Sequence, residues 1–503
     1  MAKATRLSSV VAAAICTAVV ALSLSCSGSG GGMDVDDEAY PSSVADLHVK
    51  SVTPTTVTLE WTAPGDEDTV GTAAQYDIRY STSELSWENW DSALPLSGEP
   101  APGPFGSTDT MLVTGLSENS TYYFGLKTRS HADTWSWLSN CPSVTCFNNF
   151  EVTFPDPKLD LIIRSKIAKP TGPIYRSDLL PIHEIFANNQ AIASLSGMEY
   201  CINLEVLFMW NNLVSNLSPL AGLVKMRALQ IGDNRIADIA PLAGLVNLEQ
   251  IHLHENYLIT DISALSGMTK LADVHLGGND ISDIGALAGK TAMTILVLDR
   301  NNISDVTPLA GMTNLTMLSV SENQVTSVTA LSGMTKLTSL NLYDNQVSDI
   351  APLAGLTNLV TLNLWKNEIS DISVLAGSTK LENLYLIANQ IGDLSALSGL
   401  TTLELLYLSE NLIADISALS GLTALTDLQI QSCDVTDVAP LQGLPNLQKL
   451  VLDNNSITNI APLAANAGLG DGDLLYLQGN PLSFESITVH IPALEARGVT
   501  VVY

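Results

Sequence analysis

The feature of this sequence that most constrains its fold is a motif that returns every 22 residues. Residues 359–380 read LVTLNLWKNEISDISVLAGSTK, and residues 381–402 read LENLYLIANQIGDLSALSGLTT. The leucines and the asparagine keep their places, whereas Trp365 and Lys366 are replaced by other residues. A unit this short cannot bury its own leucines, so successive units must stack and share one continuous core. The sequence therefore predicts a solenoid.

Three further columns repeat with the leucines. A buried asparagine can satisfy backbone groups of a turn, which would otherwise cost about 1–3 kcal/mol each. An aspartate column, interrupted by Ser327 and Asn459, suits capping of tight helical turns better than a ladder of calcium sites. A glycine column favours positive φ or close approach of the coils. The asparagine column comprises Asn212, Asn234, Asn256, Asn279, Asn301, Asn323, Asn345, Asn367, Asn389, Asn411, Asn455 and Asn480, with Cys433 in one place.

The pattern L-x-x-L-x-L-x-x-N, followed by I/V-x-D-I/V-x-x-L and a glycine, resembles the leucine-rich repeat, specifically the 22-residue type of bacterial internalins. The resemblance implies an α/β-type solenoid with a curved parallel β-sheet on its concave side. Short 3-10 turns and loops are expected on the convex side. We place the N-terminal cap at residues 151–179, the repeats at residues 180–480 and the C-terminal cap at residues 481–503.

A different periodicity precedes the repeats, in residues 40–150. Val57, Leu59 and Trp61 share one face of the segment TVTLEW, and such alternation predicts the strands of a two-sheet sandwich. The segment resembles a fibronectin type III domain, with Trp61 in its core and Tyr122 at the spacing of the family's tyrosine corner. The resemblance implies an all-β immunoglobulin-like sandwich that serves as a spacer or an adhesion module.

The start of the chain indicates export. Residues 1–25 combine early basic residues with an apolar run that is short for a membrane span. The ending LSLSC resembles a bacterial lipoprotein signal in which Cys26 carries the lipid, although Ser23 replaces the usual aliphatic residue. Acylation would anchor the chain to a membrane, with residues 26–39 as a flexible tether. We expect a membrane-anchored lipoprotein on the bacterial cell surface or outer membrane, with secretion as the alternative.

Composition excludes several classes of function. A formal net charge of −30 argues against nucleic-acid binding, because phosphate contacts need clustered lysine and arginine. The cysteines lack the spacing of a zinc site or a disulfide-rich scaffold, and a bond between Cys141 and Cys146 is left open. The sequence contains no nucleophile elbow, zinc-protease motif, phosphate loop or dinucleotide fingerprint. We therefore predict a protein that is not an enzyme and needs no cofactor.

Positions between the inward leucines are free of packing demands and face the concave side. Tyr343, Trp365, Tyr385 and Tyr407 occur on successive repeats, so we expect one band of exposed rings. Aromatic rings of this kind suit a protein interface, although aromatic residues also favour strands for their own sake. The candidate binding residues are Phe208, Trp210, His252, His254, His275, Tyr343, Asn363, Trp365, Tyr385 and Tyr407.

His252, His254 and His275 fall on two neighbouring repeats. Three imidazoles could hold a metal ion, but the sequence alone identifies no carboxylate or second shell beside them. We interpret these histidines as solvated or partner-facing side chains and predict no metal site.

These features together predict a cell-surface or periplasmic protein that recognises another protein noncovalently through the concave face of its repeats. Stacking of the aromatic rings on the sugars of an envelope or matrix polysaccharide is the alternative. A purely architectural role is a third reading.

Overall fold

The computed structural model describes residues 40–66, 70–146 and 148–503. They form two compact units, and the boundary along the chain lies between Asn148 and Asn149. The expected signal segment, the tether and Cys26 lie outside the described residues.

The first unit is a sandwich of two antiparallel sheets with the strand orders β1-β2-β5 and β4-β3-β6-β7. Its strands are β1 His48–Val52, β2 Val57–Thr62, β3 Gln75–Ser81, β4 Leu94–Pro95, β5 Thr108–Val113, β6 Thr121–Arg129 and β7 Ser143–Thr145, with a 3-10 turn η1 at Trp90–Ser92. This arrangement confirms the predicted all-β sandwich.

Two aromatic residues define the sandwich core. Trp61 is buried and meets the ring of Tyr76 edge-on, with 5.2 Å between the ring centroids. The hydroxyl of Tyr122 accepts a hydrogen bond from the backbone N–H of Ser117 at 2.9 Å, which is the expected tyrosine corner. Cys146 is a free, buried cysteine, so no disulfide bond joins it to Cys141.

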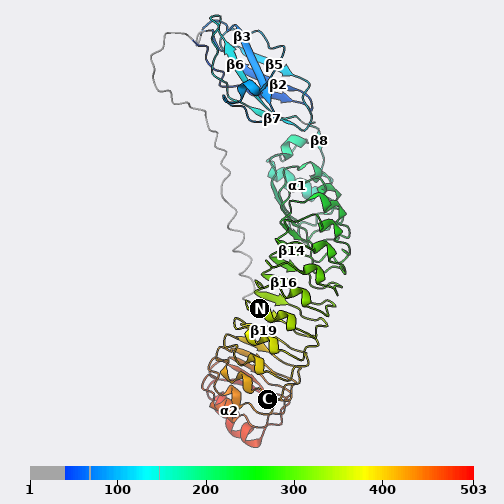
Figure 1. Ribbon diagram of the computed structural model, residues 1–503, viewed down its shortest axis with the longest axis vertical. Coiled ribbons are helices and arrows are strands. Elements are labelled where there is room, and N and C mark those ends of the chain that lie inside the picture. Colours follow the sequence, from blue (N-terminus) through cyan, green and yellow to red (C-terminus); the bar gives the residue numbers. More distant parts are fainter. Residues whose placement is uncertain (1–39, 67–69, 147) are drawn as a thin grey trace, which may run out of the picture. The chain divides into compact units, whose positions relative to one another are not determined.

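The second unit is a solenoid whose sheet contains fifteen parallel strands in sequence order, β10 to β24 (Figure 1). The strands are β10 Glu184–Phe186, β11 Val206–Phe208, β12 Ala228–Gln230, β13 Gln250–His252, β14 Asp273–His275, β15 Ile295–Val297, β16 Met317–Ser319, β17 Ser339–Asn341, β18 Thr361–Asn363, β19 Asn383–Tyr385, β20 Leu405–Tyr407, β21 Asp427–Gln429, β22 Lys449–Val451, β23 Leu474–Tyr476 and β24 Thr500–Val502.

Short 3-10 turns follow the strands along the chain. They are η3 Met198–Tyr200, η4 Ser218–Leu220, η5 Ala240–Gly244, η6 Ser263–Leu265, η7 Gly285–Leu287, η8 Thr307–Leu309, η9 Thr329–Leu331, η10 Ala351–Gly355, η11 Ser373–Gly377, η12 Ser395–Leu397, η13 Ser417–Gly421 and η14 Ala439–Leu441, and α2 Ala461–Ala465 takes the same place in a later coil. Strands on one side and 3-10 turns on the other confirm the predicted leucine-rich-repeat solenoid.

Both ends of the solenoid carry covering segments. At the N-terminal end, α1 (Pro157–Lys166) begins after Asp156, whose carboxylate accepts hydrogen bonds from two backbone N–H groups of the first turn. A two-stranded sheet of β8 (Glu151–Val152) and β9 (Ile174–Tyr175) and the turn η2 (Arg176–Leu179) complete it. At the other end, η15 (Ser486–His490, π-helical) and α3 (Ile491–Glu495) precede β24.

Each strand pairs residue for residue with the next one, which aligns the columns of the repeat. Leu340 pairs with Leu362, and Asn341 with Asn363. The residue at the centre of each triplet is leucine, isoleucine or valine and is buried in every strand from β10 to β23, and its two neighbours are partly exposed in most strands, as in β18. The register survives a one-residue insertion near Ile259, because β13 still pairs in step with β14. The leucine column therefore forms the core, and the flanking residues form a separate face.

The predicted asparagine ladder is present, and its geometry is the same in most coils. Asn367 Nδ2 donates to Leu364 O of its own coil at 3.1 Å and to Leu342 O of the preceding coil at 2.9 Å. Its Oδ1 accepts from the backbone N–H of Val347 at 3.0 Å. The Nδ2 group also donates to Trp365 O at 3.2 Å, so one buried amide binds four backbone groups and joins two coils.

Cys433 takes the asparagine position in one coil and makes a weaker connection. Its Sγ lies 3.7 Å from Leu408 O and 3.6 Å from Gln431 O, whereas an amide would bind more strongly and offer an oxygen to the Ile413 N–H. We expect Cys433→Asn to raise the free energy of unfolding by about 1–2 kcal/mol. Urea unfolding measures this change, with Cys433→Ser as the control. A loss of stability on introducing asparagine would show that this coil is shaped around the thiol.

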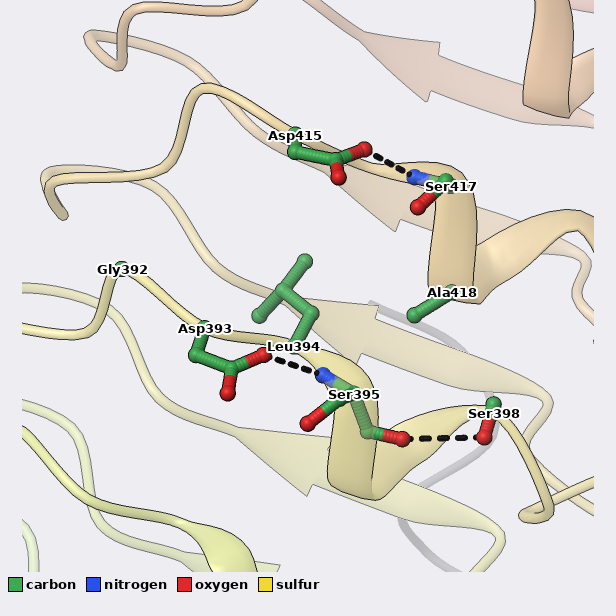
Figure 2. A pocket seen from close by; sticks show the side chains of 8 residues that line it. All are labelled: Gly392, Asp393, Leu394, Ser395, Ser398, Asp415, Ser417 and Ala418. Carbon is green, nitrogen blue, oxygen red and sulfur yellow. Dashed lines mark hydrogen bonds between the residues drawn. The ribbon is translucent and has the colours of Figure 1, made fainter.

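The aspartate column caps the 3-10 turns, as predicted. Asp393 accepts a hydrogen bond from the backbone N–H of Ser395, and Asp415 from that of Ser417, each at 2.8 Å (Figure 2). The hydrogen bonds from Ser417 lower the pKa of Asp415. A recess of about 420 Å³ lies between these two capped turns. Because each carboxylate already accepts from its own turn, the column serves the backbone of the convex side.

The glycine column differs from the prediction of positive φ or close approach of the coils. An added Cβ would meet no atom nearer than 3.5 Å at any glycine of this column, so close approach does not require glycine there. Only Gly289 and Gly311 of that column have positive φ, 73° and 86°, and each follows an alanine in extended conformation, as a type II turn requires. In most of the other coils the residue before the glycine is helical, and the glycine has negative φ. Positive φ recurs instead at the residue before each ladder asparagine, for example 57° at Lys366.

Candidate interaction surface

The candidate residues lie on the sheet face opposite the leucine core. We call it the concave face, since the strands of a curved repeat stack line its inner side. Phe208, His252, His275, Asn363, Tyr385 and Tyr407 are the last residues of their strands. Trp210, His254, Tyr343 and Trp365 stand two residues beyond a strand end. None of the ten side chains belongs to the buried core.

The four neighbouring aromatic residues form two ring pairs. The rings of Tyr343 and Trp365 are tilted, with centroids 5.1 Å apart, and those of Tyr385 and Tyr407 meet edge-on, also at 5.1 Å. Tyr385 pairs with Asn363 in the sheet register, so it stands two residues out of line with Trp365. The expected single band is thus two pairs offset along the strands by about 6.6 Å.

Charged groups flank the first ring pair. Lys366 Nζ lies 2.6 Å from Asp344 Oδ2, and both side chains remain partly exposed. Trp365 keeps 40% of its surface exposed. The Tyr343–Trp365 pair therefore presents an apolar ring surface beside an opposite-charge pair, a combination typical of protein interfaces.

The second ring pair is tied to an acidic residue. The hydroxyl of Tyr407 donates to Asp427 Oδ2 at 2.9 Å, and Lys449 Nζ lies 3.2 Å from the same oxygen. Burial and this hydrogen bond raise the pKa of Tyr407, and burial and the Asp427 charge raise that of Tyr385. Both phenols are therefore neutral donors at physiological pH.

Phe208 and Trp210 lie far from these pairs. The register places β11 six strands before β17, which corresponds to roughly 29 Å along the sheet. Phe208 meets Phe186 edge-on at 5.2 Å, and Lys166 Nζ lies over the Phe186 ring. Phe186 is 49% exposed and was missed by the sequence prediction, although it precedes Phe208 by one 22-residue repeat. The candidate residues thus form separate groups on one face.

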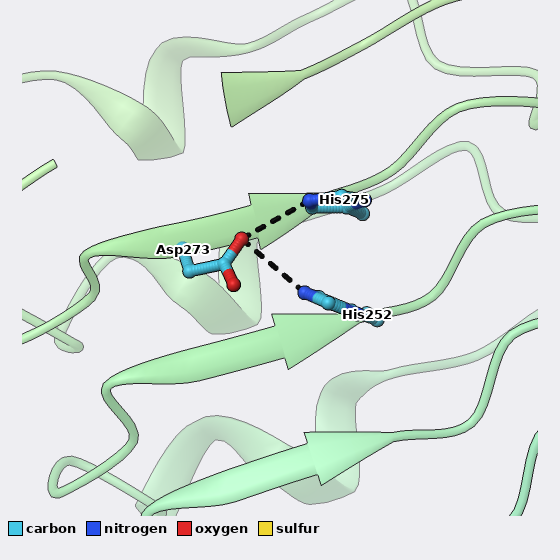
Figure 3. Close-up of side chains that lie close together, drawn as sticks. All are labelled: His252, Asp273 and His275. Atoms are coloured by element: carbon cyan, nitrogen blue, oxygen red, sulfur yellow. Dashed lines mark ion pairs between the residues drawn. The ribbon is translucent and has the colours of Figure 1, made fainter. Parts of the chain in front are cut away.

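The histidines form a group with a different membership from the one considered in the sequence. His252 Nε2 and His275 Nε2 lie 3.2 and 3.1 Å from the same oxygen, Asp273 Oδ1 (Figure 3). Their rings stack with centroids 4.0 Å apart, whereas His254 stands 6.3 and 6.5 Å from them. The sequence prediction missed Asp273, because it considered only the strand ends and the positions beyond them.

The electrostatics of this group favour a charged carboxylate at Asp273 and a neutral imidazole at His254. Burial by itself raises the pKa of Asp273, but His252, His275 and Gln250 outweigh burial and hold it well below its usual range. Burial and the two neighbouring histidines lower the pKa of His254. Asp273 is therefore ionised and His254 neutral near pH 7.

Comparison with known proteins identifies the family of the solenoid. Leucine-rich-repeat models match residues 224–267, 267–288, 313–355, 357–399 and 425–465. A crystal structure of an internalin from Listeria monocytogenes is 36% identical, with a TM-score of 0.61, and the match covers 63% of this chain and 94% of that one. The chain belongs to the leucine-rich-repeat family. A leucine-rich-repeat protein of Leptospira interrogans shares the same fold, with 22% identity, a TM-score of 0.58 and coverage of 63% and 83%.

The fibronectin type III model matches residues 41–140 of this leucine-rich-repeat protein. A chitinase of Paenibacillus xylanexedens is 35% identical over 121 residues, which are 24% of this chain and 19% of the chitinase. The chain thus spans about one fifth of the curated relative that it matches. Among the described residues, no helix combines the length and the apolar character needed to cross a bilayer.

Proposed function

We propose that this leucine-rich-repeat protein is exported, is held at the bacterial surface by a lipid on Cys26, and binds another protein noncovalently through its concave face. The two ring pairs, Tyr343 with Trp365 and Tyr385 with Tyr407, carry the proposal. The repeat leaves these positions free, since Leu342 and Leu364 beside them already fill the core. Rings that cover surface and keep an exposed edge are the residues that contribute most to protein binding.

Charge supports a protein partner. The chain has a formal net charge of −30, yet Lys366 and Lys449 flank the two ring pairs through their contacts with Asp344 and Asp427. Alternating charges around an apolar centre give a protein partner orientation and specificity. Binding of this kind needs no cofactor. The fibronectin type III domain acts as a spacer in this proposal.

Affinity capture tests the proposal. The full chain and its Tyr343, Trp365, Tyr385 and Tyr407 quadruple alanine variant are immobilised and exposed to the same surface extracts. We expect the wild-type chain to retain a protease-sensitive partner whose retention weakens with salt, and the variant to lose it. A partner resistant to protease and destroyed by periodate would indicate a polysaccharide instead. Equal retention by both chains would favour an architectural role.

A further inference from the structure

Three side chains with metal-ligating atoms converge on the concave face, outside the two ring pairs. His252 ends β13, while Asp273 and His275 begin and end β14. In-register pairing brings His252 beside His275, and residues 273 and 275 share a face because side chains alternate along a strand. Figure 3 shows one nitrogen from each imidazole ring directed at the same carboxylate oxygen of Asp273. One ligand atom from each residue lies within 4.8 Å of the other two.

Ion pairing alone leaves these atoms poorly satisfied. His252 Nε2 and Asp273 Oδ1 are both shielded from water, and neither takes part in a hydrogen bond. Buried polar atoms without hydrogen bonds are unfavourable. A cation at the point where the three side chains meet would satisfy these atoms together.

The sequence alone led to the prediction of no metal site. From the geometry we propose instead that His252, Asp273 and His275 bind one Zn²⁺ ion. Two imidazoles and one carboxylate form a zinc donor set, and nitrogen ligands disfavour calcium and magnesium. Tetrahedral zinc with bonds near 2.1 Å separates its ligand atoms by about 3.4 Å. The nitrogen-to-oxygen separations of 3.2 and 3.1 Å are close to that value before any metal is bound.

Neighbouring groups hold the ligands in place. Gln250 Nε2 donates to Asp273 Oδ2 at 2.6 Å, which fixes the carboxylate and leaves Oδ1 for the ion. The stacking of the two rings sets their orientation. Three protein ligands leave one tetrahedral position open. The side chain of His275 remains 31% exposed, so water or a donor atom of a docked partner can complete the coordination.

His254 is not a ligand in this arrangement. Its ring lies against Gly232, where an added Cβ would fall 2.5 Å from His254 Cε1, and its centroid is more than 6 Å from the other two rings. It provides a matched control, because it is the same residue type on the same face. The control also separates this site from one built of three histidines.

Titration of the full chain with Zn²⁺ tests the proposal. The chain is freed of metal with a chelator, and binding is followed by calorimetry. We expect one ion per chain, and His252→Asn and Asp273→Asn each lower the affinity about 100-fold or more, while Gln250→Ala lowers it about tenfold. His254→Asn leaves the affinity within about threefold. Co²⁺ in place of Zn²⁺ gives the strong visible absorption of a tetrahedral site.

Several outcomes would overturn the site. Absence of saturable Zn²⁺ binding does so directly. Weak binding of several ions, unaffected by the substitutions at His252 and Asp273, would mean adventitious binding to the acidic surface. An equal loss with His254→Asn would assign the ion to the three histidines. Circular dichroism of each variant confirms folding, and His275→Asn provides a second ligand variant if one of the others is unstable.

Discussion

Replacing Asn367 by alanine lowers the free energy of unfolding by about 3–4 kcal/mol. The substitution removes three donated hydrogen bonds, to the carbonyls of Leu342, Leu364 and Trp365, and one bond accepted from the N–H of Val347. The buried Val347 N–H loses its acceptor, which costs about 1–3 kcal/mol. Each lost donated bond adds about 1 kcal/mol or less, because Leu342 O and Leu364 O still accept from the column amides of Asn345 and Asn389. Because these groups belong to two coils, the loss weakens the interface that a stacked repeat depends on.

Asn358 provides the matched control for this experiment. Its side chain also joins coils, because it donates to Thr335 O of the preceding coil at 2.8 Å and accepts from Lys380 Nζ of the following coil at 2.7 Å, but it does so at the exposed surface. We expect Asn358→Ala to cost less than about 1 kcal/mol, because water replaces the lost partners. Urea unfolding of both variants measures the difference. Equal losses at the two positions would contradict a structural role specific to the buried column.

Removal of both ring pairs weakens partner binding by at least about 100-fold. Truncation of an aromatic residue that anchors a complex costs about 2 kcal/mol or more of binding free energy. A 100-fold rise in Kd corresponds to about 2.7 kcal/mol, so the loss of four such rings exceeds it even if their effects are not fully additive. The change is Tyr343, Trp365, Tyr385 and Tyr407 to alanine together. It is measured as the Kd for the captured partner, once that partner is purified.

The sandwich supplies a control for this second prediction. Trp87 and Trp137 form another exposed ring pair, with centroids 5.2 Å apart, on the fibronectin type III domain. Their double alanine variant removes comparable aromatic surface away from the concave face. We expect it to change the Kd by less than about threefold. A larger effect there than on the concave face would move the binding site to the sandwich.

Positions that repeat in every coil could be predicted from the sequence. The roles of Asn367 and Asp393 follow from one physical requirement each, since a buried turn needs hydrogen-bond partners and a 3-10 turn needs a cap. Because asparagine and aspartate recur at these positions in nearly every repeat, their hydrogen bonds to the backbone could be predicted from the sequence alone. The same reasoning was wrong for most of the glycine column, where other backbone conformations with negative φ suffice.

Contacts between residues in different columns were harder to predict. Asp273 on β14 reaches His252 on the neighbouring strand β13, because a residue at the start of one strand lies diagonally opposite the end of the next. That relation depends on side-chain direction as well as on register. The division of the aromatic band has the same cause, because Trp365 and Tyr385 occupy different columns. Residues that recur at the same position of every repeat therefore predict the fold. The candidate site instead depends on diagonal contacts between residues at different positions of neighbouring repeats.

Site-specific photocross-linking tests the central claim most directly. A photoreactive phenylalanine analogue replaces either Tyr343 on the concave face or Ala354 in η10, an exposed position of the same coil on the convex side. The analogue keeps an aromatic ring at position 343, so binding is retained. We predict that the partner cross-links from position 343 and not from position 354. Cross-linking from position 354 alone would show that recognition uses the convex side and would contradict a concave binding face.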